Sequence, residues 1–172
     1  MSESADYIAQ LPWSGRTAEE FIDLLIQLIT KTTDVEQLDD DVVESTFDIQ
    51  LESFADHKRD YAARLTSEWS VGIVLSDDGL TGKLLKLRFF DNNGRTKSDL
   101  TGICGIDSAG FSAALTEAGF EQRPVNGVHG ERQGQKYDRG LVHVYTLTRG
   151  EANQSHHKIS HECITTVGIQ HA

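Results

Sequence analysis

The chain is short of positive charge. Its 172 residues include 16 lysines and arginines against 27 aspartates and glutamates, which gives a formal net charge of −11 at pH 7. A protein that binds nucleic acid or an anionic membrane unaided needs clustered lysines and arginines, so we expect neither ligand. The acidic balance favours a basic protein partner, or serves solubility alone.

The sequence also lacks a long hydrophobic run and has few cysteines. Its longest apolar-rich segment, residues 21–29, is far too short to span a bilayer, and the N-terminal residues do not have the pattern of a signal peptide. Cys104 and Cys163 are too few for a disulfide scaffold, and we expect them to be free thiols. These features predict a cytoplasmic protein that does not associate with membranes.

Prolines are scarce, with two in the chain, while 38% of the residues are hydrophobic and 25% are charged. This is the composition of an ordinary folded domain and not of a disordered chain. The length is enough for one self-sufficient core. We therefore expect residues 1–172 to form a single domain, with residues 1–16 as an N-terminal arm.

Helical spacing of apolar residues begins after this arm. Thr17 and Glu20 have the spacing of a capping box, in which hydroxyl and carboxylate satisfy free backbone donors. The apolar stripe over residues 17–30 is broad. We therefore expect this helix to be buried on two sides, against a sheet and against another helix or a second subunit.

A second helix is predicted near residues 108–118. Asp107 or Ser108 can cap its first turn by accepting free N–H groups. Gly119 supplies the left-handed residue that ends it, and Phe120 can fold back onto the last turn as the apolar partner of that stop.

Alternating apolar and polar residues predict strands after each helix. In the first half the alternation covers residues 47–51, 69–76 and 85–89, and residues 61–66 form either a further strand or the start of the 69–76 strand. In the second half a short strand begins at Phe120, the segment 137–148 contains the strand LVHVYTLT, and a last strand covers 160–169. We predict an α+β fold, with an antiparallel sheet and two main helices on one face. The order of elements also allows two helix-then-strands halves, residues 17–94 and 102–170.

Residues 34–44 carry six acidic side chains and no basic one. Interleaved apolar residues predict a short amphipathic helix, whose carboxylates form either a solvated face or a docking surface for a basic protein. In the second interpretation, partner-binding residues come from this segment and from the turn after the 69–76 strand: Asp34, Glu36, Asp39, Asp40, Asp41, Glu44, Asp77 and Asp78.

The densest group of potential metal ligands is His156, His157, His161 and Cys163. A helix would bring His157 and His161 to one face, whereas a strand would bring His161 and Cys163 together. The spacing matches no established zinc motif. We therefore predict no metal and no cofactor.

Cys104 precedes the second predicted helix, and the N–H groups of a helix favour a thiolate. With His129, His143 or His161 as a base, it could be the nucleophile of a Cys-His hydrolase. The isoleucines on either side of Cys104 instead predict burial in the core, where cysteine behaves as a small hydrophobic residue. We expect no catalytic residue and no enzymatic activity.

Three segments of the second half, FSAALTEAGF, YDRGLVHVYTLT and ITTVGI, resemble small immunity proteins that neutralise bacterial polymorphic or contact-delivered toxins. The resemblance implies a cytoplasmic, acidic, non-enzymatic inhibitor that covers the active site of a basic toxin or effector, for example a nuclease. One alternative is a secretion chaperone or adaptor that dimerises through the 17–30 helix. The other is the Cys104 hydrolase. Both a monomer and a homodimer remain open.

Overall fold

The computed structural model describes residues 3–79, 82–94, 98–129, 132–150 and 161–172. The helices are α1 (Glu3–Gln10), α2 (Ala18–Lys31), α3 (Asp40–Phe47) and α4 (Ser108–Glu117), with short 3-10 helices η1 (Val35–Gln37) and η2 (Leu100–Ile103). The strands are β1 (Glu52–Ala55), β2 (Lys58–Arg64), β3 (Trp69–Asp77), β4 (Lys83–Asp91), β5 (Glu121–Asn126), β6 (Arg132–Arg139), β7 (Val142–Gly150) and β8 (Glu162–His171).

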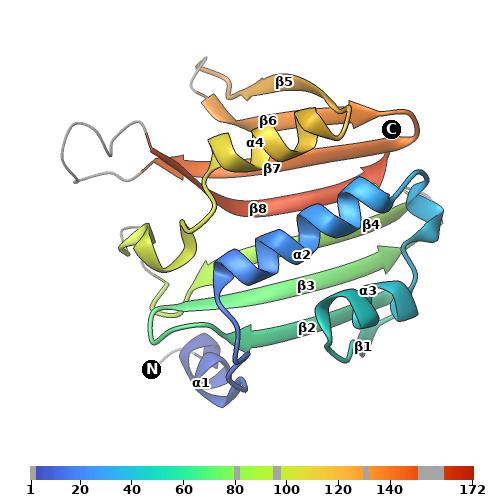
Figure 1. Ribbon diagram of the computed structural model, residues 1–172. Helices are drawn as coiled ribbons and strands as arrows, with labels where there is room; N and C mark the ends of the chain where they lie inside the picture. The colour runs from blue at the N-terminus through green and yellow to red at the C-terminus, as the bar shows by residue number, and fades with distance from the viewer. Residues whose placement is uncertain (1–2, 80–81, 95–97, 130–131, 151–160) are drawn as a thin grey trace.

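The strands form one antiparallel sheet in the order β1-β2-β3-β4-β8-β7-β6-β5. The first four strands and the last four each follow one another along the chain, and the two sets meet where β4 pairs with β8. Figure 1 shows α2, α3 and α4 on one face of this sheet, with α2 across its middle. The predicted α+β fold, with an antiparallel sheet and two main helices on one face, is confirmed.

The start of α2 agrees with the sequence in detail. The Thr17 hydroxyl accepts the Glu20 N–H at 3.2 Å, and the Glu20 carboxylate accepts the Thr17 N–H at 2.7 Å. The backbone hydrogen bond from Thr17 is the main cause that lowers the pKa of Glu20. The apolar stripe of α2 is buried on two sides, as predicted, because α2 packs on the sheet and also contacts α3 and α4.

The start and end of α4 are also confirmed. Asp107 caps the helix by accepting the Gly110 N–H at 2.8 Å. Gly119 has a φ of +87°, and the Phe120 N–H then donates to the Leu115 carbonyl at 3.0 Å. A left-handed residue followed by a buried aromatic side chain is a common way to end a helix.

Arg139, at the end of β6, joins the C-terminal ends of α2 and α4. Its guanidinium lies 4.3 Å from the centroid of the Phe120 ring. It donates to the Ala118 carbonyl after α4 at 2.8 Å, and to three carbonyls at the end of α2, those of Ile29, Thr30 and Thr32, at 3.2, 3.0 and 2.9 Å. The Ile29 carbonyl also accepts the Thr32 N–H at 3.2 Å, and Arg139 supplies donors to carbonyls at the ends of both helices.

The expected strand at residues 47–51 is wrong. Phe47 is the last residue of α3, where it is buried with Val43 one turn earlier, and Asp48 ends the helix with a φ of 50°. The first strand begins only at Glu52. Three apolar residues at a spacing of two were too short a pattern to separate a helix end and its exit from a strand.

The N-terminal arm contains α1 and then joins the sheet. Around Trp13 the chain pairs with Arg64: the Ser14 N–H donates to the Arg64 carbonyl at 2.9 Å, and the Arg64 N–H donates to the Pro12 carbonyl at 2.8 Å. The Arg64 guanidinium lies 4.4 Å from the Trp13 ring centroid. The arm therefore covers part of the edge of β2 that β1 leaves open.

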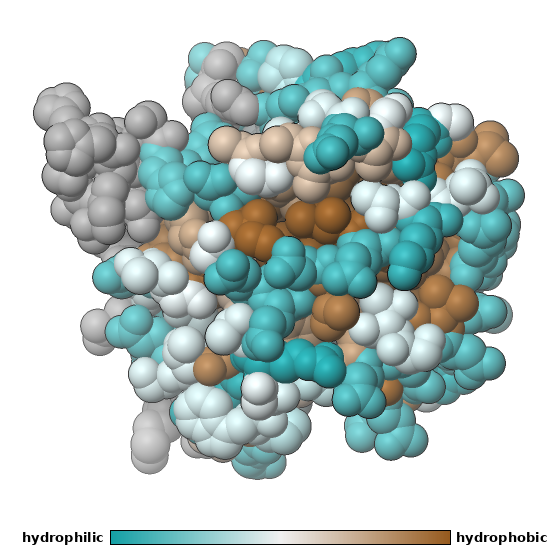
Figure 2. Space-filling view, viewed as in Figure 1, coloured by the Kyte–Doolittle hydropathy of each residue, from teal (hydrophilic) through white to brown (hydrophobic). Residues whose placement is uncertain are grey.

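The helix face of the molecule is mostly polar. Figure 2 shows hydrophilic and intermediate residues over most of this face, with hydrophobic surface gathered between α2 and α4. No helix in the described ranges is both long enough and apolar enough to cross a membrane.

Candidate functional site

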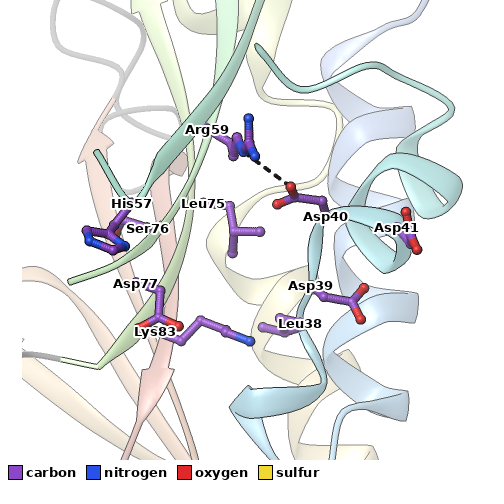
Figure 3. A pocket seen from close by; sticks show the side chains of 10 residues that line it. All are labelled: Leu38, Asp39, Asp40, Asp41, His57, Arg59, Leu75, Ser76, Asp77 and Lys83. Carbon is purple, nitrogen blue, oxygen red and sulfur yellow. Dashed lines mark ion pairs between the residues drawn. The ribbon is translucent and has the colours of Figure 1, made fainter. Parts of the chain in front are cut away.

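Four of the eight predicted acidic residues, Asp39, Asp40, Asp41 and Asp77, line a groove of about 470 Å³ between α3 and the strands. Figure 3 shows Asp39, Asp40 and Asp41 on the helix side of the groove, and Asp77 on the strand side. The full lining is Leu38, Asp39, Asp40, Asp41, His57, Arg59, Leu75, Ser76, Asp77 and Lys83. We call this surface the acidic groove.

Three of the predicted partner-binding residues hold the local backbone. Asp34 caps η1 by accepting the Glu36 N–H at 3.0 Å, and Asp39 caps α3 by accepting the Val42 N–H at 2.9 Å. Glu44 accepts the Leu51 N–H at 2.7 Å. Their carboxylates still contribute negative charge, but their side chains already have structural roles.

Two cations of the chain enter the groove. Arg59 lies 3.2 Å from the carboxylate of Asp40, and the Lys83 ammonium lies 3.7 Å from the carboxylate of Glu36. Lys83 also donates to the Glu36 carbonyl at 3.0 Å. Asp40 and Arg59 are each about half exposed, at 45% and 46%, so water screens their attraction and the pair contributes little stability.

The remaining acidic residues, Asp41, Asp77 and Asp78, are exposed. Among the described residues, neither Asp41 nor Asp77 forms an ion pair. Two leucines lie at the base of the groove: Leu75 keeps 6% of its surface exposed, and Leu38 is fully buried. A leucine floor with carboxylates at its rim suits a lysine or arginine side chain, whose stem is apolar and whose head is charged.

A second cluster lies where the chain enters α4. Cys104 and Cys163 form a disulfide, although 59 positions separate them in the sequence, so the prediction of free thiols is wrong. Cys163 lies on β8 and is fully buried, whereas Cys104, just after η2, is half-buried. The sequence could not show this pairing, because it depends on the topology that places β8 beside the η2–α4 connection.

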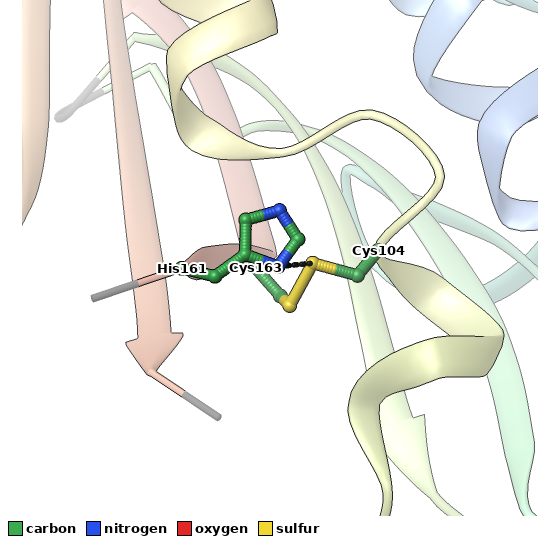
Figure 4. A group of neighbouring side chains, drawn as sticks. All are labelled: Cys104, His161 and Cys163. Carbon is green, nitrogen blue, oxygen red and sulfur yellow. Dashed lines mark hydrogen bonds between the residues drawn. A yellow bond between two sulfur atoms is a disulfide. The ribbon is translucent and has the colours of Figure 1, made fainter. Parts of the chain in front are cut away.

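His161 lies directly beside this disulfide. Its Nδ1 is 3.8 Å from Cys104 Sγ, and its Nε2 is 2.8 Å from Asp107 Oδ2. Figure 4 shows the ring beside the two bonded sulfurs. We call Cys104, Cys163, His161 and Asp107 the cysteine–histidine cluster.

The structure separates the three bases that the sequence offered for Cys104. His161 is next to the sulfur, whereas His143 pairs with Asp138 on neighbouring strands. His129 is exposed after β5. Of the four potential metal ligands in the sequence, His156 and His157 lie outside the described residues, while His161 and Cys163 lie together. Sequence reasoning missed Asp107 as a partner of His161, since it identified Asp107 only as a helix cap.

A Cys-His hydrolase needs a free thiol beside its base. Here the disulfide occupies the Cys104 sulfur. The surface depression next to His161, with a volume of about 410 Å³, is lined by Asp107, Ser108, Ala109, Ser112, Gln122, His161 and Glu162. Cys104 is not part of this lining, so the depression does not present its sulfur to a substrate.

The acidic groove and the cysteine–histidine cluster lie at opposite ends of the central strands. Asp77 pairs with Lys83 at the beginning of β4, while Cys163 is near the beginning of β8, which runs antiparallel to β4. The two sites are therefore physically independent.

Comparison of the chain with protein-family models, with curated proteins and with solved structures finds no match.

Proposed function

We propose that the protein is a non-enzymatic binding protein that recognises a basic protein partner through the acidic groove. In its most concrete form it is an immunity protein that neutralises a cationic toxin, such as a nuclease, by covering the toxin's active site. The observation that carries this proposal is the groove itself, in which Asp41 and Asp77 from separate elements flank the apolar floor of Leu38 and Leu75.

Charge would guide the first encounter. The predicted partner-binding carboxylates outnumber the two cations, Arg59 and Lys83, that pair with them. A surface with such an excess raises the association rate of an oppositely charged protein. Salt should reduce this effect, because the screening length is only about 8 Å at physiological ionic strength.

Contact would then depend on a lysine or arginine of the partner. Its aliphatic stem would pack over Leu75 while its charge meets Asp77 or Asp41. The Asp40–Arg59 pair can open to admit the incoming cation, since an exposed ion pair is worth less than about 1 kcal/mol. A toxin side chain held in this way is withdrawn from its own substrate.

The packing of α2 favours this proposal over a chaperone that dimerises through the 17–30 helix. Six residues of α2 are buried within the single chain: Ala18, Phe21, Ile22, Leu25, Leu28 and Ile29. Among its large apolar residues, Leu24 and Ile26 are the ones left partly exposed. Most of the apolar face that a dimer would need is therefore already used.

The disulfide favours a binding protein over the Cys104 hydrolase, because it consumes the nucleophile. The disulfide also removes one argument about the cellular compartment of the protein. Free thiols were a reason to expect the cytoplasm, whereas disulfides persist in oxidising compartments. A cytoplasmic location therefore remains part of the immunity proposal and rests on that proposal alone.

The proposal is tested first by capture and then by mutation. The tagged full chain is used to capture partners from its host at low salt, and a captured protein is eluted with high salt, identified and expressed alone. We expect one basic protein that arrests growth by itself and is neutralised by co-expression of this chain. An acidic partner, or a partner with no effect on growth, would contradict the immunity function.

The role of the groove is tested on the captured partner with Asp41→Asn/Asp77→Asn. We expect association about tenfold slower at low salt, with the difference disappearing at high salt. The matched control is Asp23→Asn/Glu117→Gln, which removes the same charge from exposed positions on α2 and α4. Equal effects of the two double variants would show that net charge matters and that the groove does not.

A further inference from the structure

We propose that reduction of the Cys104–Cys163 disulfide creates a binding site for zinc or a similar thiophilic divalent cation. The ligands are the two thiolates and Nδ1 of His161. One ligand atom from each residue lies within 4.8 Å of the others. The proposal concerns a site independent of the acidic groove and of any partner bound there.

The distances suit a tetrahedral ion. Bonds of about 2.3 Å to sulfur and 2.0–2.1 Å to nitrogen place a nitrogen and a sulfur ligand roughly 3.6 Å apart, and two sulfur ligands roughly 3.8 Å apart. His161 Nδ1 is already 3.8 Å from Cys104 Sγ. Once the S–S bond is broken, rotation of the cysteine side chains separates the sulfurs. The two Cα atoms, 5.0 Å apart, need little movement.

Asp107 orients the histidine for this role. Its Oδ2 lies 2.8 Å from His161 Nε2, so that nitrogen carries the proton and the Nδ1 lone pair faces the sulfurs. Metal-binding histidines usually donate their other N–H to a carboxylate or carbonyl, which fixes the ring and raises its basicity. Asp107 is itself held in place by the N–H of Gly110.

The residues around the proposed metal site enclose it on one side and leave it open to solvent on the other. Cys163 is fully buried, whereas the His161 side chain is 36% exposed and borders the depression that Asp107 and Glu162 also line. Three protein ligands beside such a depression leave the fourth position for water or a small ligand. This is the ligand number of zinc sites that keep an open position.

Oxidation and metal binding exclude each other. A dithiol reductant donates two electrons and two protons to the disulfide, which gives two thiols and an oxidised reductant. Binding of Zn²⁺ then releases the two thiol protons, and the metal keeps its oxidation state. A disulfide oxidant would accept two electrons from the two thiolates and, with two protons from water, become a dithiol; this would expel the ion, because disulfide sulfurs are no longer thiolate ligands.

The test uses the full chain, oxidised or reduced with a phosphine under anaerobic conditions, and Co²⁺ as a spectroscopic probe that zinc then displaces. We expect no thiolate-to-cobalt charge-transfer absorption from the oxidised chain, and one equivalent of bound metal from the reduced chain. His161→Ala should weaken binding by at least about tenfold. His171→Ala, which removes an exposed histidine at the far end of β8, should leave binding unchanged.

Far-UV circular dichroism of the reduced chain, with and without zinc, keeps the result interpretable. Loss of the fold even with zinc present would overturn the proposal, and so would a folded reduced chain without the charge-transfer band. Equal affinities of His161→Ala and the unaltered chain would remove His161 from the site. If His161→Ala does not fold, Cys104→Ser provides the second test, and an undiminished charge-transfer band in that variant would overturn the assignment.

Discussion

Asp107 and His161 are joined by a contact of 2.8 Å between Oδ2 of the carboxylate and Nε2 of the ring. The other carboxylate oxygen, Oδ1, accepts the Gly110 N–H at 2.8 Å and so caps α4. Asp107 also forms an isolated backbone bridge with Cys163. One residue thus connects the start of α4 to the start of β8, next to the disulfide.

These two roles of Asp107 can be separated by mutation. Asp107→Asn should leave the unfolding free energy of the oxidised chain within about 1 kcal/mol, because asparagine caps helices as well as aspartate does. The affinity of the reduced chain for zinc should fall about 10–100-fold, because the carboxylate partner of the histidine is lost. Denaturation and zinc competition measure the two effects. Unchanged zinc affinity would mean that Asp107 does not orient the ring.

Reduction of the disulfide should itself change stability. Opening a cross-link between residues 59 positions apart frees the unfolded chain, and we expect the unfolding free energy to fall by about 2–4 kcal/mol. Zinc should restore part of this loss by binding the folded state. Urea denaturation with and without phosphine measures the change, and Cys104→Ser/Cys163→Ser is the control that phosphine should not affect. If phosphine did not change the unfolding free energy of the unaltered chain, this would contradict the expected effect of the disulfide.

Local sequence patterns correctly predicted those helix starts and stops whose residues all lie within a few positions of one another. The capping box of Thr17 and Glu20 and the stop at Gly119 are self-contained, and both are confirmed. The strand predicted over residues 47–51 failed because Phe47 belongs to the helical pattern of α3. At such a short spacing, helix ends and strands share the same apolar signal.

The cysteine–histidine cluster was beyond the reach of local patterns. Cys104, Asp107 and His161 come from two distant parts of the chain, which only the pairing of β8 within the sheet brings together. The sequence suggested His161 as one of three possible bases for Cys104, but it gave no reason to choose among them. The acidic groove was partly foreseeable, because its helix-side carboxylates are consecutive in the sequence, whereas the leucine floor and Arg59 required the fold.

Arg139 is half-buried, and we expect its substitution to lower the free energy of unfolding more than substitution of an exposed arginine does. Arg139→Lys keeps the charge but cannot reach the carbonyls of both α2 and α4 with a single ammonium group. We expect the unfolding free energy to fall by about 2–3 kcal/mol, since charged hydrogen bonds are lost and carbonyls are left unsatisfied. Arg88→Lys is the matched control, because Arg88 is exposed on β4. Similar losses for the two variants, measured by urea denaturation, would refute this role.

Asp60 places a carboxylate opposite another carboxylate on the edge of the sheet. It pairs directly with Glu52 between β1 and β2. Burial raises the pKa of Asp60 above its ordinary value of 3.8, and the charge of Glu52 raises it further. The folded chain therefore binds this proton more tightly than the unfolded chain does. It follows that ionised Asp60 opposes folding at neutral pH, and that this cost disappears as the pH falls through the raised pKa towards 3.8.

Asp60→Asn removes the charge with little change of shape. At pH 7 we expect the variant to be more stable than the unaltered chain by about 0.5 kcal/mol, the size of a screened like-charge pair across two strands. The difference should shrink as the pH falls through the raised pKa, because Asp60 then becomes neutral in the unaltered chain as well. Urea denaturation across this pH range measures the effect, and Asp56→Asn, an exposed neighbour in the β1–β2 turn, should show no gain. A variant that is less stable at pH 7 would mean that ionised Asp60 supports the edge strand instead of straining it.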